Sequence, residues 1–518
     1  MNDFSYKSRM VAGGHMTEPP ASMTYASVVS RDSVRIALTM AALHDLEVKA
    51  ADIENAYLTA PCKEKIAVRC GPEFGPNAGK TAILVRALYG LKSSGNAFRT
   101  FLAQTMVDLG FTPCKADSDV WMRRETRPDG FKYYSYVLLY VDDILCVHHD
   151  AMSILKKIGK RFTLKDGFGD PDLYLGAKIR QTKMPNGVVC WMQSPAQYIK
   201  AAVQNVEEHL QKEYNSKLPK NASAPFPRDY DPVLDVTEEL GKEGRSYYQS
   251  QIGVLRWMVE LGHIDIITEV SLLVSHLALP RKGHLEAVFH IYAYLKQHHA
   301  YVLALDPTYP DIDKSMFNLD ADWHGMYDGV SEPIPDNMPE PLGKELVLRL
   351  FKDSDHAGDR MIRRSRTGYI IYGNNAPLYW LSKRQGTIET SVFGAEFVAL
   401  KQGLEQVRAL RYKLRMMGIP VEDPCWVFGD NMSVVNNVSR PESTLKKKSH
   451  EICYHYARES VVMGESAMTH VRSELNPSDI CTKVVPGGMK RNTLVGMILY
   501  NTDSDDILKT WKNEEESK

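Results

Sequence analysis

Two patterns of hydrophobic and polar positions alternate along the chain. Around residues 133–149, runs rich in Tyr, Val, Leu and Ile flank Asp142 and Asp143, which predicts two short strands with the acids at the tight turn between them. Residues 46–53 also favour a strand, because apolar residues occupy alternate positions. Asp52 continues this apolar face at the end of the strand, where burying an acid costs free energy unless the acid has a functional role or is solvated.

The middle of the chain combines both periodicities. Residues 94–109 have the apolar spacing of an amphipathic helix, and residues 162–192 are typical of strands joined by turns. A helix is predicted over 196–214 after a Ser-Pro start, and two or three more over 246–298. The Pro-rich, acidic stretch 306–343 indicates a linker or a long surface insertion.

The last part alternates strands and helices. Predicted strands end in Asp353 and Asp430, and a long helix carries Glu396 at the start of an apolar stripe that continues to Leu414. A final helix is predicted to carry Asp479 behind an Asn-Pro start. The pattern therefore brings four acids to the ends of strands and onto helices.

Composition narrows the class of protein. The chain has 518 residues, 44% hydrophobic and 25% charged, which is typical of a globular protein of three or four domains. The formal net charge of -1 confines any nucleic-acid contact to local basic patches. Eight cysteines are scattered singly, which favours a reducing compartment over disulfides or a zinc site. No apolar run suits a membrane span or a signal peptide, so we expect a soluble, intracellular protein without a membrane partner.

The pair Asp142 and Asp143 is a candidate metal site. Adjacent carboxylates on an apolar hairpin repel each other unless a cation lies between them, and Mg²⁺ prefers oxygen ligands. An exposed turn would explain the pair equally well, because Asp is common in turns. Asp52 is the candidate third carboxylate.

Four ordered blocks carry a resemblance. They are DIENAYL around Asp52, YGLK from Tyr89, GFTPCKADSDVW from Gly110, and YVDD ending at Asp143. In this order and spacing they resemble the reverse transcriptase of copia-type (Pseudoviridae) LTR retrotransposons, a region of the Pol polyprotein.

The resemblance implies roles for particular residues. Asp52, Asp142 and Asp143 would bind two Mg²⁺ ions, which Mn²⁺ could replace. Tyr57 matches the aromatic that blocks a ribose 2′-hydroxyl, although it would also serve as a core aromatic. Lys7 and Arg9 fall in the block that binds the dNTP triphosphate.

The acidic C-terminal part resembles ribonuclease H. Its blocks are KDSDHAGDRMIRRSRTGY, AEFVAL, FGDN and NPSDICTK. The resemblance implies that Asp353, Glu396, Asp430 and Asp479 bind two further Mg²⁺ ions. Asp355 is the alternative to Asp353.

Two further features belong to this part. His470 could assist proton transfer or product release, although a histidine at a strand end often has no such role. Basic residues in 360–366 and 446–448 suit the phosphates of a hybrid, or are solvated surface charges.

Together these features imply an α/β protein. An α+β palm with fingers and a helical thumb, as in right-hand polymerases, would precede an RNase H-like α/β domain. The expected domains are fingers and palm with N-terminally truncated fingers (1–195), a thumb or connection region (196–305), the linker or insertion (306–344), the ribonuclease H-like domain (345–485) and a polar tail (486–518).

The implied function is RNA-directed DNA synthesis with ribonuclease H activity. The partners would be an RNA template, a DNA primer, an RNA/DNA hybrid and dNTPs. The location would be the cytoplasm, in a virus-like particle, or the nucleus. The alternative is a decayed or domesticated copy that binds nucleic acid without polymerase activity; a nucleotide cyclase would explain only the first group of acids.

Overall fold

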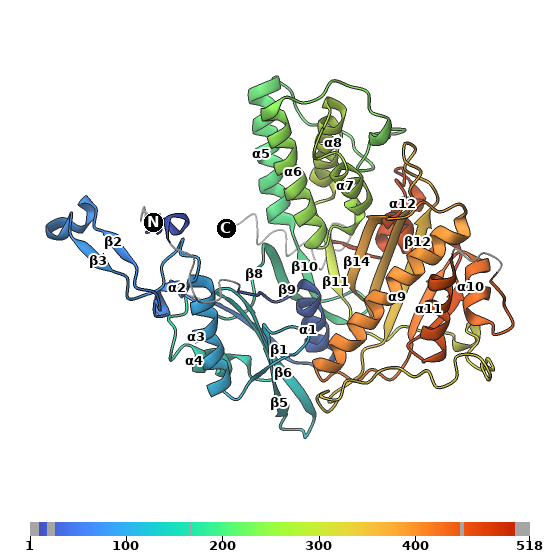
Figure 1. Ribbon diagram of the computed structural model, residues 1–518, viewed down its shortest axis with the longest axis horizontal. Coiled ribbons are helices and arrows are strands. Elements are labelled where there is room, and N and C mark those ends of the chain that lie inside the picture. The colour runs from blue at the N-terminus through green and yellow to red at the C-terminus, as the bar shows by residue number, and fades with distance from the viewer. Residues whose placement is uncertain (1–9, 18–25, 166–167, 446–449, 503–518) are drawn as a thin grey trace. The chain divides into compact units, whose positions relative to one another are not determined.

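The computed structural model describes residues 10–17, 26–165, 168–445 and 450–502 (Figure 1). The chain forms two compact units: unit 1 comprises Met1–Ala37 and Asp45–Pro171, and unit 2 comprises Leu38–His44 and Asp172–Lys518. The finer domain boundaries expected above stay predictions.

The elements up to residue 171 are mainly those of one antiparallel sheet with helices. In order they are η1 (Gly14–Met16), α1 (Arg31–Leu43), β1 (Glu47–Asp52), α2 (Ala56–Thr59), β2 (Ala67–Arg69), η2 (Pro72–Asn77), β3 (Thr81–Ile83), α3 (Ser94–Asp108), β4 (Thr112–Pro113), β5 (Val120–Thr126), β6 (Lys132–Tyr140), β7 (Asp143–His148) and α4 (Ala151–Ile158). The sheet order is β1-β7-β6-β5-β4, and β2 and β3 form a separate ribbon. The strands expected over 133–149 and 46–53 are therefore neighbours.

The core of unit 1 lies between this sheet and its helices. Strand β6 is buried over almost its whole length, as its run of Tyr, Val and Leu predicts. Helix α3 contributes Phe98, Leu102 and Met106 to the same cluster as Val137 and Ile144 of the sheet. The predicted amphipathic helix thus packs its apolar side against the strands that carry the acidic turn.

Unit 2 contains two further sheets and a helical region. Its elements are β8 (Leu173–Tyr174), β9 (Ala177–Lys183), β10 (Val189–Ser194), α5 (Ala196–Tyr214), η3 (Pro232–Leu234), α6 (Lys242–Glu260), η4 (Ile264–Ile266), α7 (Ile267–Val274), α8 (Lys282–His298), β11 (Tyr301–Leu305), η5 (Lys314–Met316), β12 (Leu348–Asp355), β13 (Arg366–Gly373), β14 (Ala376–Arg384), α9 (Val392–Met416), β15 (Cys425–Gly429), α10 (Met432–Ser439), α11 (Glu451–Val462), β16 (Ser466–His470), η7 (Ser473–Leu475), η8 (Pro477–Cys481), α12 (Met489–Gly496) and β17 (Tyr500–Asn501). One sheet has the order β17-β11-β10-β9-β8, and the other has the order β14-β13-β12-β15-β16.

The second of these sheets is mixed. Strands β14, β13 and β12 are antiparallel, whereas β12, β15 and β16 run parallel. Helix α9 packs across β12 and β13, as Figure 1 shows. Its predicted stripe is buried from Glu396 through Leu404 to Leu414. This arrangement confirms the predicted α/β class, and one detail differs: the element carrying Asp479 is the short 3₁₀ helix η8, not an α-helix.

Residues 306–343 form a segment, here called the strap, that packs against this sheet and its helices. Its one regular element among the described residues is η5. Phe317 is buried against Trp426, with ring centroids 4.7 Å apart. Further along, Glu332 binds the guanidinium groups of Arg411 and Arg415 on α9 at 2.6–2.9 Å. A stretch with loop-like composition is thus anchored by apolar and ionic contacts, to which hydrogen bonds such as Asn318 Nδ2 to the carbonyl oxygen of Ser439 are added.

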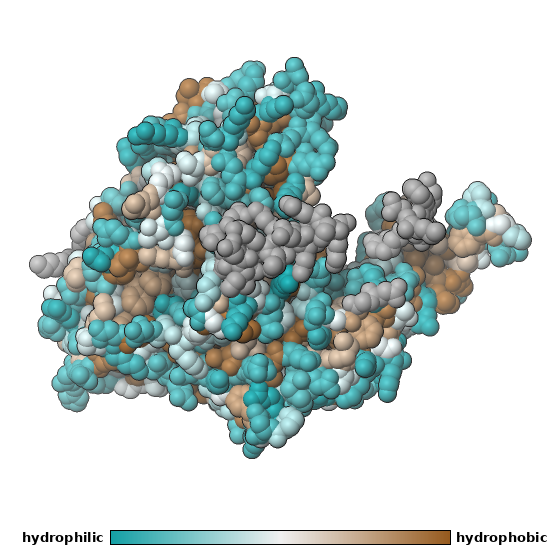
Figure 2. Space-filling view, turned by 180° about the vertical axis from the view of Figure 1, so that it is seen from behind, coloured by the Kyte–Doolittle hydropathy of each residue, from teal (hydrophilic) through white to brown (hydrophobic). Residues whose placement is uncertain are grey.

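The described helices give no sign of a bilayer-spanning segment. On the face shown in Figure 2, hydrophilic residues predominate and apolar residues are scattered among them. Within the described ranges, no helix combines the length and the apolar character that crossing a membrane requires.

The Glu332 contact predicts a pH-dependent stability. Although burial acts in the opposite direction, hydrogen bonds from Arg411 and Arg415 hold the pKa of Glu332 at about 2, below its ordinary value of about 4.3. Glu332→Gln should lower the free energy of unfolding near pH 7 by about 3 kcal/mol, because it leaves two largely buried arginines without their partner.

The direction of this pH dependence follows from the lowered pKa of Glu332. The stabilisation is complete above about pH 4.3 and is lost as the pH falls towards 2, so urea unfolding curves of variant and wild type should converge in acid. Asp336→Asn, which changes an exposed acid of the same strap, is the matched control. A constant difference between pH 7 and pH 3 would contradict the assignment.

Candidate functional site

The first acidic cluster consists of Asp52, Asp142 and Asp143 and lies in unit 1. Strands β6 and β7 form a hairpin with a two-residue turn, Val141 and Asp142, before Asp143 begins β7. Strand β1 pairs with β7 in a register that sets Asp52 opposite Asp143. Val141 has φ 57°, which is strained for a β-branched residue, and such strain is often found at functional sites. The sheet therefore brings together acids that lie far apart in the sequence.

The electrostatics of this cluster favour a cation. Burial raises the pKa of Asp143, the charges of Asp142 and Asp52 add to the rise and Lys165 opposes it, and together they hold this pKa at about 6. Lys165 Nζ donates a hydrogen bond to Asp52 Oδ2, whereas the buried Asp52 Oδ1 has no hydrogen-bond partner among the described residues. A buried oxygen without a donor is costly, and carboxylate oxygens are ligands that Mg²⁺ prefers. The chemistry of these donors suits a divalent ion, but the acids of the described residues whose oxygens meet within 4.8 Å are Asp353, Asp430 and Asp479, so Asp52, Asp142 and Asp143 share a sheet edge without forming a closed ligand set.

Three further residues were expected at this site, and the structure describes one of them, Tyr57. Tyr57 stands on α2, with its ring centroid 4.9 Å from that of Tyr89 and 6.1 Å from that of Phe98. Burial raises the pKa of Tyr57, and the charge of Asp142 adds to this rise. Tyr57 is thus a packed aromatic close enough to Asp142 to feel its charge, and its role at a ribose 2′-hydroxyl stays a prediction. Lys7 and Arg9 lie outside the described residues.

The aspartate triad, Asp353, Asp430 and Asp479, forms a second cluster in unit 2. Asp353 stands near the end of β12, and Asp430 follows the end of the parallel strand β15. Asp479 comes from η8. One carboxylate oxygen of each residue lies within 4.8 Å of the others. Three acids from separate elements thus converge at one edge of the sheet, and this donor set fits a hard divalent cation.

Lysines and hydroxyl groups surround the triad. Lys483 Nζ lies 3.0 Å from Asp353 Oδ2 and 2.8 Å from Asp479 Oδ1, and Lys490 Nζ lies 2.7 Å from Asp479 Oδ2. The hydroxyl of Thr482 donates to Asp353. Burial raises the pKa of Asp353 to about 7, although Lys483 opposes the rise. Burial acts the same way on Asp479, but hydrogen bonds from the two lysines outweigh it and hold that pKa below its usual range.

Glu396 lies beside the triad but does not belong to it. Its Oε2 accepts a hydrogen bond from Lys352 Nζ at 2.5 Å, and its Oε1 accepts from the amide and the hydroxyl of Ser354 at 3.2 and 3.0 Å. Asp355, the alternative to Asp353, also lies apart from the triad and accepts from the amide of Arg366. The structure therefore brings three of the four expected acids together and binds the fourth to protein donors.

His470 ends β16 next to β15. Its Nε2 lies 3.2 Å from the backbone carbonyl oxygen of Asp430. Ser473 donates to the Asp430 carboxylate at 2.8 Å. His470 is therefore close to the triad, because it contacts the backbone of Asp430. The basic stretch 446–448 lies outside the described residues.

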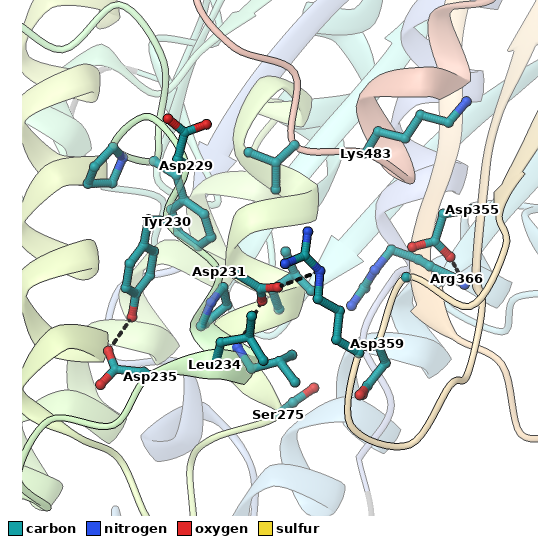
Figure 3. Close-up of a pocket in the computed structure, with 18 of the residues that line it drawn as sticks. Asp229, Tyr230, Asp231, Leu234, Asp235, Ser275, Asp355, Asp359, Arg366 and Lys483 are labelled. Atoms are coloured by element: carbon teal, nitrogen blue, oxygen red, sulfur yellow. Dashed lines mark hydrogen bonds and ion pairs between the residues drawn. The ribbon is translucent and has the colours of Figure 1, made fainter.

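A pocket of about 1580 Å³ adjoins the triad within unit 2. Figure 3 shows residues on facing walls: Asp229, Tyr230, Asp231, Leu234 and Asp235 on one side, and Asp355, Asp359, Arg366 and Lys483 on the other. Arg360 Nε reaches across to within 3.4 Å of Asp231 Oδ2. The pocket thus joins the loop before α6 to the residues flanking Asp353 and Asp479.

Sequence reasoning missed several residues of both clusters. Thr482 and Lys483 follow Asp479 inside the block NPSDICTK, so their proximity to that acid was a usable signal. Lys352 precedes Asp353, but nothing in the local pattern indicates that it is buried. Lys165 carried no signal at all, because only the tertiary fold brings it to Asp52.

Comparison with known proteins identifies the family. Residues 1–220 match the family described as reverse transcriptase (RNA-dependent DNA polymerase). That match covers 220 of the 518 residues and includes the whole of the first acidic cluster. The whole chain is also 27% identical over 493 residues to the Retrovirus-related Pol polyprotein from transposon TNT 1-94 of Nicotiana tabacum, covering 93% of this chain and 33% of that protein.

Other relatives agree with this reverse transcriptase assignment. The Retrovirus-related Pol polyprotein from transposon RE1 of Arabidopsis thaliana is 24% identical over 485 residues, covering 92% of this chain and 29% of that protein. The chain therefore spans about a third of the length of these relatives. The matches confirm the predicted relationship to copia-type Pol polyproteins.

Solved structures give weaker similarity. LC11-RNase H1 in complex with RNA/DNA hybrid is 18% identical, covering 26% of this chain and 93% of that chain, with a TM-score of 0.22. The foamy viral protease-reverse transcriptase in complex with RNA/DNA hybrid is 11% identical, covering 85% of this chain and 66% of that chain, with a TM-score of 0.27. At these scores the superpositions add nothing to the fold described above.

The triad predicts metal-dependent stability. In a chain carrying Asp52→Asn and Asp142→Asn, which removes the first acidic cluster as a second ion site, Mn²⁺ at about a hundred times its dissociation constant should stabilise the fold by about 2.7 kcal/mol relative to EDTA, because only the folded site binds it. Asp430→Asn should lose most of this gain, which thermal unfolding measures. Asp311→Asn, at an exposed acid, is the matched control. An unchanged gain in Asp430→Asn would exclude the triad as the ion site responsible.

Proposed function

We propose that this chain is an RNA-directed DNA polymerase with a separate ribonuclease H activity. The observation that carries the polymerase is the pairing of Asp52 with Asp143 across β1 and β7, within residues that match the reverse transcriptase family. The observation behind the nuclease is the convergence of the aspartate triad on a mixed sheet. Both would catalyse phosphoryl transfer.

In the polymerase, Asp52, Asp142 and Asp143 would hold two Mg²⁺ ions, or Mn²⁺ in their place. When bound, such ions lower the pKa of an attacking hydroxyl and neutralise charge on the phosphates. The unpartnered Asp52 Oδ1 and the raised pKa of Asp143 both favour a bound cation. Lys165 is 40% exposed, so it can leave Asp52 when an ion replaces its charge.

The remaining residues would select and orient the nucleotide. Tyr57, packed on Tyr89 and Phe98, would present a fixed ring to the ribose of the incoming dNTP. Lys7 and Arg9 would bind the triphosphate. Their role rests on the resemblance of their block.

In the nuclease, Asp353, Asp430 and Asp479 would hold Mg²⁺. Lys483 and Lys490 are 41% and 51% exposed and can move away from the carboxylates they contact. His470 would move a proton at the edge of the site, a role that its contact with the Asp430 carbonyl oxygen supports. Glu396 would support the site from beside it.

The substrate of the nuclease would be an RNA/DNA hybrid, and the partners of the polymerase an RNA template and a DNA primer. The pocket next to the triad offers Arg360, Arg364 and Lys483, and phosphate binding requires positive charge. A cytoplasmic location, in a virus-like particle or with access to the nucleus, is part of the same proposal. The free cysteines are compatible with a reducing compartment.

The separation of the two activities is the first prediction from this proposal. Asp142→Asn should lower primer extension on an RNA template by more than about a hundredfold, because it removes an ion ligand, and should leave hybrid cleavage unchanged. Asp430→Asn should have the reverse effect. Each variant is the control for the other when both assays use the same samples.

The same experiment tests the alternative. Loss of both activities in either single variant would contradict two independent sites. A wild-type chain that binds hybrid but neither extends nor cleaves would instead indicate a decayed or domesticated copy.

The position of Tyr57 predicts sugar selectivity. Tyr57→Val should raise incorporation of rNTPs relative to dNTPs by about 10- to 200-fold, because removing the ring opens space for a 2′-hydroxyl. Single-nucleotide extension with each substrate measures the ratio of kcat/KM values. Tyr57→Phe keeps the ring and is the matched control. If Tyr57→Val lowered both rates equally, the ring would serve packing alone.

A further inference from the structure

Lys352 is a buried cation next to the aspartate triad. It precedes Asp353 on β12, so the two side chains leave the strand on opposite faces. Its side chain is 0% exposed, and its Nζ lies 2.5 Å from Oε2 of Glu396, whose side chain is 3% exposed. A buried lysine is costly unless an acid neutralises it, so each residue requires the other.

The packing holds Lys352 in this position. A Cβ added to Gly429 of the neighbouring strand β15 would lie 2.6 Å from Lys352 Cε, so the lysine fills the space that the glycine leaves. Lys483 and Lys490 contact the triad from partly exposed positions and can move into solvent. Lys352 has no such path, and its charge stays beside Glu396.

Glu396 is occupied by protein donors on both oxygens. Lys352 takes Oε2, and the amide and hydroxyl of Ser354 take Oε1. The hydrogen bond from the Ser354 backbone amide to Glu396 fixes the backbone of β12 immediately after Asp353. This is the geometry of a residue that positions Asp353, and it explains why the carboxylates that converge are three aspartates without the glutamate.

We infer that Lys352 is an internal countercharge that withholds Glu396 from metal binding, so that the site takes one divalent ion through Asp353, Asp430 and Asp479. This inference rests on the proposed ribonuclease H function and refines it. Four acids together with one fixed cation carry a charge of −3, which favours one tightly bound divalent ion over two. Glu396 is a positioning residue that acts through Ser354.

The test counts ions. The full chain carrying Asp52→Asn and Asp142→Asn, which removes the first acidic cluster as a competing site, is titrated with Mn²⁺ while free Mn²⁺ is followed by electron paramagnetic resonance. We expect one tightly bound ion, which Asp430→Asn abolishes. Adding Lys352→Met should create a second ion site, about tenfold or more tighter than any second site of the parent, because a like charge has been removed beside it.

A matched double variant separates charge from packing. Lys352→Met with Glu396→Gln removes both charges at similar volume, and we expect it to fold and to bind one ion, as the parent does. Should Lys352→Met alone fail to fold, Glu396→Gln decides the question: the inference requires that it still binds one ion, with affinity within about threefold of the parent.

The outcomes are distinguishable. Two tight ions in the parent, one of them lost in Glu396→Gln, would overturn the inference. So would a folded Lys352→Met variant that still binds a single ion. Hybrid cleavage is measured separately on the wild-type chain: its absence would overturn the proposed ribonuclease function, whereas the ion count decides the role of Lys352.

Discussion

Repulsion between neighbouring carboxylates is the constraint on which this structure depends. Each unit gathers acids where separate elements meet: unit 1 through the register of β1 against β7, and unit 2 through the parallel strands β12 and β15. Burial makes the repulsion stronger, as the raised pKa values of Asp143 and Asp353 indicate. Each cluster can persist only if positive charge accompanies it.

The fold supplies that positive charge in two ways. Lysines that are partly exposed, such as Lys165 and Lys483, contact the acids and can be displaced by another cation. Lys352 is fully enclosed and cannot leave. The first kind leaves a carboxylate available to a ligand, whereas the second binds it to the protein. The same chemical group thus has opposite consequences, which its burial decides.

In the strap, a buried charge is also balanced by opposite charges, here in a structural role. Glu332 holds Arg411 and Arg415 on the side of α9 that would otherwise carry two uncompensated charges. Because α9 also carries Glu396, this contact helps to fix the helix that supports Asp353 through Ser354. A stretch that contains almost no regular structure therefore neutralises two buried charges on the helix that also carries Glu396.

The sequence by itself determined the elements and the acids. Hydrophobic periodicity is local, so it predicted the hairpin around Asp142, the helix α3 and the buried stripe of α9, and ordered motifs identified the reverse transcriptase family. The resemblance to ribonuclease H grouped four acids, Asp353, Glu396, Asp430 and Asp479, of which the structure brings the three aspartates together. The local pattern predicted the wrong helix type at Asp479, since a Pro-containing start suits a 3₁₀ helix as well.

Only the tertiary structure decided which charges meet. Lys165 and Lys352, which pair with acids, and Glu332, which pairs with two arginines, lie on other elements than the groups that they contact. The loop before α6 likewise reaches the pocket beside Asp355 only through the packing of the helical region. Such contacts depend on strand register and burial over long separations, and a pattern of neighbouring residues carries no information about either.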